Sequence, residues 1–302
     1  MEAHPAHLPP VSAAPRAGIR LPGIGSGLGR GMVVLYLSLI VLLPLAAVVD
    51  ESFARGLDGF WNAVSGEQSL AALKLTVGCS LIVAGINAVF GTIIAWVLVR
   101  DDFPGKGAVN AVIDLPFALP TIVAGLTLLT LYGADSPFGL NVAFTRVAIV
   151  MALAFITLPF VVRAVQPLLM EMDREMEEAS TSLGASGLTT FRRVIFPNLL
   201  PGIVAGVMLA FARALGEYGS LILISGNIPF KTEVSSVFIR SQIETGNTAG
   251  AAAVSVVLLA LSVLMLIAVS LLARSGRHRG NRGRFKAAID RVISRSQIGG
   301  GA

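Results

Sequence analysis

Apolar residues gather into six long stretches that are separated by shorter polar segments. A helix needs about 20 mostly apolar residues to cross the hydrocarbon core of a bilayer. The stretches that approach or exceed this length are 32–49, 75–99, 111–132, 147–162, 199–224 and 251–272. They predict an all-α integral membrane protein with six transmembrane helices. The composition agrees, because 54% of the residues are hydrophobic and only 14% are charged, which excludes a soluble enzyme or a disordered protein.

The first stretch, 32–49, follows positive residues, as the apolar part of a signal peptide does. No A-x-A cleavage site comes after it, and the chain continues directly with Asp50 and Glu51. We therefore expect an uncleaved first transmembrane helix.

Two prolines, Pro116 and Pro120, interrupt the third stretch. Proline kinks or breaks a helix because it has no N–H to donate and its ring meets the preceding turn. We predict a helix kink at these residues. A permanent kink is the favoured interpretation, and a hinge used in gating is the alternative.

Lys and Arg are divided unequally between the two sides that six helices would create. Of the 23 such residues, 17 lie in the N-terminal segment, the second and fourth loops and the C-terminal tail, five lie on the other side, and Arg213 lies within the fifth stretch. Positive residues accumulate on the cytoplasmic side of membrane proteins, so both termini are predicted to be cytoplasmic. This division accounts for the net charge of +5 without nucleic acid as a partner.

The two ends of the chain differ in composition from the apolar stretches. Residues 1–31 are rich in Pro, Gly and Ala, which predicts a disordered cytoplasmic tail. Residues 273–302 hold eight of the positive side chains and are predicted to form a basic cytoplasmic tail that touches membrane lipid.

The polar segment 163–198 is longer than the other loops. Its acidic first half has helical spacing, Gly184 and Gly187 allow a sharp turn, and a second short helix is expected to end at Pro197 and Pro201. The residues alone leave two interpretations open. The segment is either a docking element for a cytoplasmic partner or an amphipathic helix at the membrane surface.

Residues 178–197 resemble the EAA loop of ABC-transporter permease subunits, whose pattern is E-A-A, three residues, G, nine residues and I-x-L-P. The residues that match are Glu178, Ala179, Gly184 and Pro197, and those that depart are Ser180, Val194 and Phe196. The resemblance implies a type I ABC importer permease architecture with a cytoplasmic coupling-helix loop. In that family the turn at 178–184 would lie in a groove of a separate ATPase.

Three further segments are similar to the sulfate and thiosulfate permease subunits: DLPFALPT at 114–121, RALGEYGS at 213–220 and GNIPFKTE at 226–233. The form GEYGS resembles the T-type subunit, whose W-type partner usually has Phe in place of Tyr218. The likeness covers about 69–272, which we take as the permease domain. Molybdate permeases share a stretch near the fifth span but lack DLPFALPT, so a molybdate or tungstate permease is the alternative to sulfate.

The resemblance also implies partners. A second permease subunit, for which a W-type paralogue is expected, would pair with this chain above a cytoplasmic ATPase dimer in a bacterial inner membrane. A periplasmic or extracellular sulfate-binding protein would deliver the anion.

No catalytic chemistry is expected in this chain itself. The sequence has no G-x-x-x-x-G-K-[ST] phosphate loop, no His/Cys metal cluster and no nucleophile–base set. We therefore predict a transport subunit without a cofactor of its own, with ATP and Mg²⁺ bound by the ATPase.

Arg213 and Glu217 are four residues apart within the fifth stretch, so they share a helix face and can pair. An ionisable group in mid-membrane costs about 2.5–3.5 kcal/mol on insertion scales, so both should face other helices or water. In one interpretation Arg213 lines the translocation pathway and attracts a dianion. In the other, which we favour, the pair is structural.

A stand-alone secondary anion transporter is a less favoured function, because the internal repeats common in that class are not evident.

Overall fold

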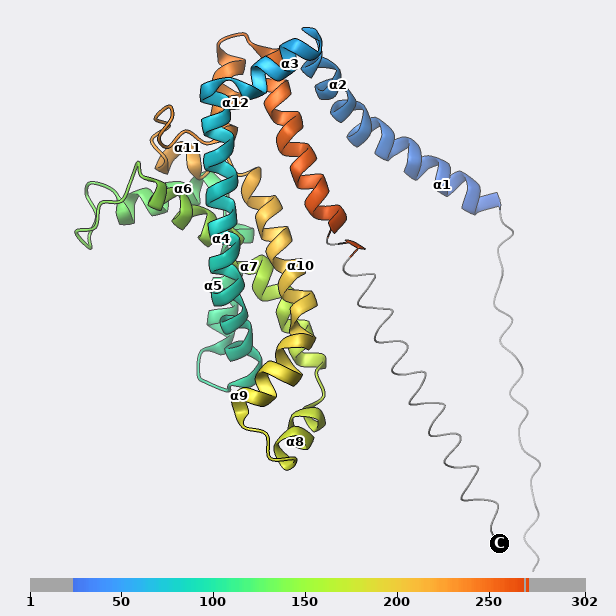
Figure 1. Ribbon diagram of the computed structural model, residues 1–302, viewed down its shortest axis with the longest axis vertical. Helices are drawn as coiled ribbons and strands as arrows, with labels where there is room; N and C mark the ends of the chain where they lie inside the picture. Colours follow the sequence, from blue (N-terminus) through green and yellow to red (C-terminus); the bar gives the residue numbers. More distant parts are fainter. Residues whose placement is uncertain (1–23, 269, 272–302) are drawn as a thin grey trace, which may run out of the picture. The chain divides into compact units, whose positions relative to one another are not determined.

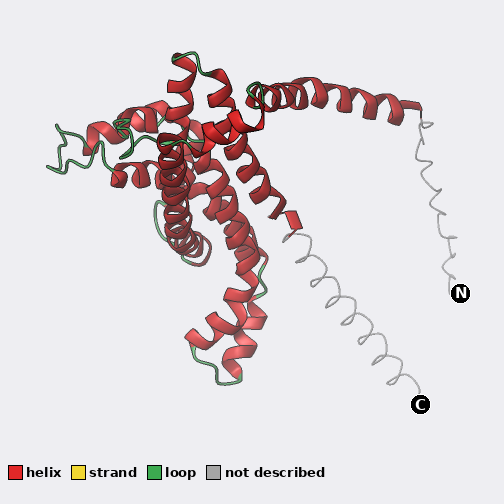
Figure 2. Ribbon diagram, turned by 45° about the horizontal axis from the view of Figure 1, so that its top comes forward, coloured by secondary structure: helices red, strands yellow, loops and turns green. Residues whose placement is uncertain are grey.

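The computed structural model describes residues 24–268, 270 and 271, and all regular elements within this part are helical (Figure 2). The chain divides into two compact units, residues 1–47 and 48–302. The predicted C-terminal tail, 273–302, lies outside the described residues, as do residues 1–23 of the predicted N-terminal tail. The all-helical fold is confirmed, and each unit is described below by itself.

The first unit contains an apolar helix that covers the predicted stretch 32–49. It comprises α1 (Ile24–Leu37), a π-helical turn (Ser38–Leu42) and the beginning of α2 (Leu43–Ser52). The helix Gly27–Ser52 is long and apolar enough to cross a membrane.

The second unit is a bundle of long helices with shorter helices at its two ends (Figure 1). Its long helices are α4 (Glu67–Arg100), α7 (Arg146–Glu171), α10 (Phe196–Leu215) and a last helix, Thr248–Ala268. The shorter helices are α3 (Gly56–Ser65), α5 (Lys106–Ala118), α6 (Thr121–Tyr132), α8 (Arg174–Ser182), α9 (Gly187–Thr190), α11 (Leu221–Ile224) and α12 (Ser235–Glu244). α3 and α12 lie at the end of this unit opposite to α8 and α9 (Figure 1).

The core of the bundle is the middle of α7, where Val161, Val162 and Val165 are completely buried. The neighbouring helices approach it through glycine. A Cβ on Gly91 of α4 would lie 2.8 Å from the Cβ of Val161, and one on Gly206 of α10 would lie 2.8 Å from its Cα. Small residues at such positions let helix backbones pack closely, which is a common source of stability in membrane bundles.

The predicted third span, 111–132, consists of two helices, α5 and α6, which are bent by 114°. Leu119, at the break, has an extended backbone (φ −83°, ψ 134°), and Pro120 is the N-cap of α6. A proline pushes the preceding residue out of the helical region, which explains the position of the break. Pro116 lies inside α5, three residues before Leu119.

The predicted fourth span, 147–162, is too short, since α7 continues to Glu171. The polar segment therefore begins at Met172 and not at Arg163. Arg163 remains inside the helix because neighbouring helices supply partners for its guanidinium, as described below.

The predicted fifth span, 199–224, is also divided. Its long helix ends at Leu215, and α11 begins only at Leu221. At its other end the helix begins earlier than predicted, because Gly187–Leu215 is one continuous helical segment. Pro197 does not end the preceding short helix, since a π-helical turn, Phe191–Ile195, changes the hydrogen-bond pattern immediately before it.

Candidate functional site

The segment that resembles the EAA loop folds into a helical hairpin, formed by α8, a turn and α9 with its π-helical extension. We call residues 174–195 the α8–α9 segment. Asp173 caps its first helix by accepting a hydrogen bond of 3.0 Å from the backbone N–H of Glu175. Figure 1 shows the segment at one end of the second unit, at the end of the bundle reached by α4, α5 and α7.

The turn after α8 is a Schellman motif centred on Gly184. The backbone N–H of Gly184 donates to the carbonyl of Thr181 over 2.9 Å, and that of Ala185 donates to the carbonyl of Ser180 over 3.2 Å. Gly184 has φ of +81°, a conformation that costs other residues energy because their Cβ meets the backbone. Gly184 is therefore required by the backbone of the turn, while the space around it is open.

The residues that match the EAA pattern are all exposed: Glu178, Ala179, Gly184 and Pro197. The first three lie on α8 and its turn, whereas Pro197 lies at the start of α10. Two apolar side chains flank the turn, Leu183 with 89% of its surface exposed and Leu188 with 67%. Exposed apolar side chains beside a carboxylate are typical of a protein-binding surface.

The α8–α9 segment is attached to the end of α4 by side chains. Arg100 of α4 forms an ion pair with Glu177 of α8 and lies over the ring of Trp96 at 5.4 Å. Trp96 in turn meets Phe191 edge-on, with ring centroids 5.9 Å apart. Trp96, Glu177 and Phe191 also line an open pocket of about 340 Å³, together with Glu178. The segment is thus joined to α4 by side chains and to α10 by the chain itself.

A second cluster forms where the two broken helices meet. We call it the helix-break contact, formed by residues 119–125 and 216–220. A Cβ on Gly125 would lie 2.5 Å from the carbonyl oxygen of Ser220, and one on Gly219 would collide with the hydroxyl of Thr121. The segments 114–121 and 213–220, which were singled out separately in the sequence, are therefore packed together.

Glu217 holds the turn of the helix-break contact. Its carboxylate, with 1% of the side chain exposed, accepts hydrogen bonds from the backbone N–H of Ser220 at 3.0 Å and from its hydroxyl at 3.1 Å. Arg213 lies 2.7 Å from the other carboxylate oxygen, and 36% of its side chain is exposed. The pair forms although Glu217 lies two residues beyond the end of α10.

A polar network that we did not predict joins α5 to α7. Arg163 Nε donates to Asp114 Oδ1 over 2.8 Å, and Arg163 Nη1 donates to Asn110 Oδ1 over 3.2 Å. Gln166 accepts another hydrogen bond from Arg163 Nη1. Asn110 and Asp114 share one helix face by their spacing, as do Arg163 and Gln166, and this was the available sequence signal.

The third segment of interest, 226–233, forms a compact loop above the start of α7. Three successive backbone N–H groups, those of Lys231, Thr232 and Glu233, point to the carbonyl of Ile228. Glu233 also accepts a hydrogen bond of 2.8 Å from Gln68 of α4. No cluster of three or more metal-ligating side chains occurs among the residues that the structure describes.

Residues 87–278 match the family described as "Binding-protein-dependent transport system inner membrane component". The chain belongs to this family. The family is described as a membrane component of transport systems, which agrees with the prediction that the chain is a transport subunit and not an enzyme.

Several relatives in this family confirm the resemblance to T-type sulfate permeases. The chain is 44% identical to the "Sulfate transport system permease protein CysT" of Synechocystis sp. over 83% of this chain and 90% of that protein. It is 42% identical to the protein of the same name from Escherichia coli K12, over 85% of this chain and 95% of that protein.

Solved transporter structures share the fold. The bacterial alginate ABC transporter, in complex with a pentasaccharide-bound periplasmic protein, has a chain that aligns with a TM-score of 0.68 and 16% identity. The alignment covers 83% of this chain and 95% of that one. An inward-facing methionine transporter, MetNI, aligns with a TM-score of 0.50 and 21% identity, over 70% and 98% of the chains. At these identities the likeness establishes the permease architecture alone.

Proposed function

We propose that this chain is a membrane-spanning subunit of an ATP-driven importer that moves sulfate, and also thiosulfate, into the cytoplasm. What supports sulfate is the likeness of the chain to proteins named as sulfate permeases. Two segments that carry this likeness, 114–121 and 213–220, pack together at the helix-break contact, where a Cβ on Gly219 would collide with Thr121. The relatives with 42–44% identity, which are named sulfate permeases, share nearly the whole chain with it.

The α8–α9 segment is the surface that couples transport to a separate ATPase. ATP and Mg²⁺ are bound by that ATPase and not by this chain. Leu183 and Glu178 are exposed on a hairpin whose turn is fixed by the Schellman motif at Gly184, so the surface is formed before the partner binds. Pro197, at the start of α10, connects this surface to the long helix.

The orientation follows from the division of charge. With the α8–α9 segment in the cytoplasm, both termini are cytoplasmic and the loop at 226–233 faces the outside of a bacterial inner membrane. A sulfate-binding protein approaches from that outer side. The second permease subunit is a W-type paralogue, which pairs with this chain around a shared pathway.

Arg213 and Glu217 form a structural ion pair. Glu217 is needed by the turn that it caps, and Arg213 neutralises a carboxylate that would otherwise be buried alone. The exposed third of Arg213 keeps a second role open, in which its guanidinium draws the dianion along the pathway. The kink at Pro116 and Pro120 is permanent, and the alternative is a hinge used in gating, for which the 114° break at Pro120 is the place where α6 would turn against α5.

Uptake of labelled sulfate tests this function, in cells that lack the chain and are complemented with wild-type protein or with Gly184→Asp. We expect wild-type uptake to be inhibited by thiosulfate and not by molybdate, and Gly184→Asp to abolish both uptake and co-purification of the ATPase. Gly246→Asp is the matched control, since Gly246 also has a positive φ, of +79°, in open space but lies after α12.

Two results would contradict the proposal. Inhibition mainly by molybdate would replace sulfate with the alternative substrate. Normal ATPase co-purification with Gly184→Asp would remove the α8–α9 segment as the coupling surface. Equal membrane content of the variants, measured by immunoblot, is required for either conclusion.

A further inference from the structure

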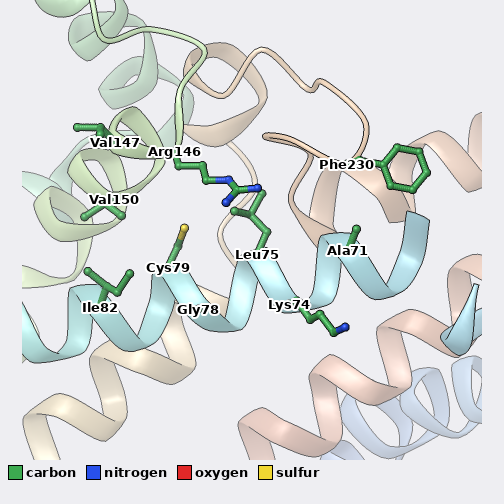
Figure 3. A pocket seen from close by; sticks show the side chains of 10 residues that line it. All are labelled: Ala71, Lys74, Leu75, Gly78, Cys79, Ile82, Arg146, Val147, Val150 and Phe230. Carbon is green, nitrogen blue, oxygen red and sulfur yellow. The ribbon is translucent and has the colours of Figure 1, made fainter. Parts of the chain in front are cut away.

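A cavity of about 590 Å³ lies along the first half of α4, where this helix passes the beginning of α7 (Figure 3). Ten residues line it, of which two are cations, Lys74 and Arg146, and none is a carboxylate. The remaining side chains are apolar apart from the thiol of Cys79. The cavity is outside both clusters described above and has no part in ATPase coupling.

The two cations border the cavity on opposite sides of the α4 axis in Figure 3. Lys74 is exposed and has no ion pair among the described residues. Arg146 Nε donates to the carbonyl of Lys231 over 3.0 Å, and its two terminal nitrogens have no partner within the described part of the chain. Both cations have unused donors, but the exposed side chain of Lys74 points away from Arg146 in Figure 3, so one anion contacts both only after Lys74 changes rotamer.

The position of Lys74 makes an anionic ligand favourable. It lies seven residues after the start of α4, roughly 10 Å along a helix that is otherwise apolar enough to span a membrane. A cation beside hydrocarbon is costly unless it reaches the interface or an opposite charge. The four-carbon chain of a lysine allows its ammonium group to extend toward the interface.

The walls of the cavity suit a hydrocarbon chain and not a small hydrated anion. Leu75, Ile82, Val147 and Val150 line it, and Phe230 lies at one end. These side chains offer no hydrogen bond to the oxygens of a free sulfate or phosphate. A ligand with an anionic head and an apolar tail satisfies both the cations and the walls.

We propose that this cavity binds an anionic phospholipid, with the phosphate held by Lys74 and Arg146 and an acyl chain lying along Gly78 between α4 and α7. Phosphatidylglycerol has the required charge and shape. The placement of this lipid in the outer leaflet rests on the proposed orientation, whereas the binding itself does not.

Gly78 supplies a variant that fills the cavity without changing its charge. A Cβ on Gly78 would meet no atom within 4 Å, so a leucine there projects into the space of the acyl chain. Gly85 is a matched control. It lies two turns further along the same helix face, has equally open surroundings and does not line the cavity.

Native mass spectrometry of the complete transporter, purified in detergent, tests the proposal by titration with dioleoyl phosphatidylglycerol or dioleoyl phosphatidylethanolamine. We expect the wild type to prefer phosphatidylglycerol. Lys74→Gln should weaken that binding about fivefold, the effect of one cation near an anionic headgroup. Gly78→Leu should reduce it further, and Gly85→Leu should leave it unchanged.

Three outcomes would overturn the proposal. One is unchanged phosphatidylglycerol binding by both Gly78→Leu and Lys74→Gln. The second is displacement of the lipid by millimolar sulfate, which would make the cavity a free-anion site. The third is photo-crosslinking from a benzophenone placed at Ile82 to the second permease and not to lipid.

If Gly78→Leu does not assemble, Lys74→Gln decides alone, because the exposed side chain of Lys74 supports no packing. Loss of sulfate uptake is not a readout here, so the proposed function and the lipid site fail independently.

Discussion

The α8–α9 segment and the helix-break contact both depend on glycine, but for different physical reasons. Gly184 of the α8–α9 segment is surrounded by open space and is needed because its φ is +81°. Gly125 of the helix-break contact has an ordinary backbone and is needed because a Cβ would press on Ser220. Gly184 shapes a surface that another protein can contact. Gly125 has no side chain, so the two segments of the helix-break contact can pack closely. Substitutions should separate the two regions by the kind and the size of their effect.

The largest effect is expected at the helix-break contact. Gly125→Leu places a side chain where the backbone of Ser220 now lies, and this backbone cannot move without opening the turn that Glu217 caps. Overpacking typically costs about 1–3 kcal/mol, and because the clash here is with backbone we expect about 3 kcal/mol, a large part of the stability of a domain. Thermal unfolding and membrane yield measure it. Gly85→Leu, in open space, should behave as wild type, and equal losses for both variants would remove the packing explanation.

Removal of the buried carboxylate should come next. Glu217→Ala leaves Arg213 without its partner and the N–H of Ser220 without an acceptor. We expect a loss of about 2–3 kcal/mol, below the usual value for a buried pair because Arg213 is partly exposed.

Thermal unfolding of the purified complex measures this loss. Glu244→Ala is its control, since Arg240 and Glu244 form the same i,i+4 pair on an exposed helix face. The control should change stability by less than about 1 kcal/mol. Similar losses from the two variants would mean that burial of Glu217 has no energetic consequence.

A smaller effect is expected at the turn of the α8–α9 segment. Gly184→Ala forces a Cβ into the left-handed region and should cost about 1–2 kcal/mol, whereas Gly184→Asn should cost less because Asn tolerates this conformation. The melting temperature and the recovery of the ATPase with the complex report both variants. If Gly184→Asn lowers the melting temperature as much as Gly184→Ala does, the position excludes any side chain, and the positive φ is not the reason for the glycine.

The smallest effect on stability is expected at the tip of the same segment. Leu183→Ala removes a side chain that is 89% exposed, so the free energy of unfolding should change by no more than about 0.5 kcal/mol. Affinity for the ATPase should nevertheless fall about tenfold, as for an apolar anchor in an interface. Ile243→Ala, exposed on α12, is the control and should alter neither quantity. A destabilised Leu183→Ala, or an unchanged affinity, would contradict the docking role.

The two regions also differ in how far the sequence could predict them. The α8–α9 segment depends on local features, such as the cap at Asp173 and the turn at Gly184, and these can be read from short spacings. The helix-break contact depends on residues about 95 positions apart. Pro116 and Pro120 led us to predict a kink in 111–132, but nothing in 199–224 indicated that its long helix ends at Leu215, or that the two breaks meet.

The charged network around Arg163 was missed for a related reason. A positive residue after an apolar stretch is the ordinary mark of a helix end, so Arg163 was assigned to the loop. Its helix continues because Asp114 and Asn110 of α5 reach it across the bundle. Such compensation is a tertiary property, and it explains why the segment lengths were less predictable than their number.

The continuous helix Gly187–Leu215 gives the protein a lever. Its 29 residues measure about 43 Å at 1.5 Å per residue, from the α8–α9 segment to the turn beside Glu217. A rigid rod of this length that tilts by about 10° around its lower end displaces the other end by about 7 Å. The π-helical turn Phe191–Ile195 lies near the end around which the helix would tilt, where the altered hydrogen-bond pattern would let the helix bend. A small movement of the α8–α9 segment would in this way become a larger displacement at the helix-break contact.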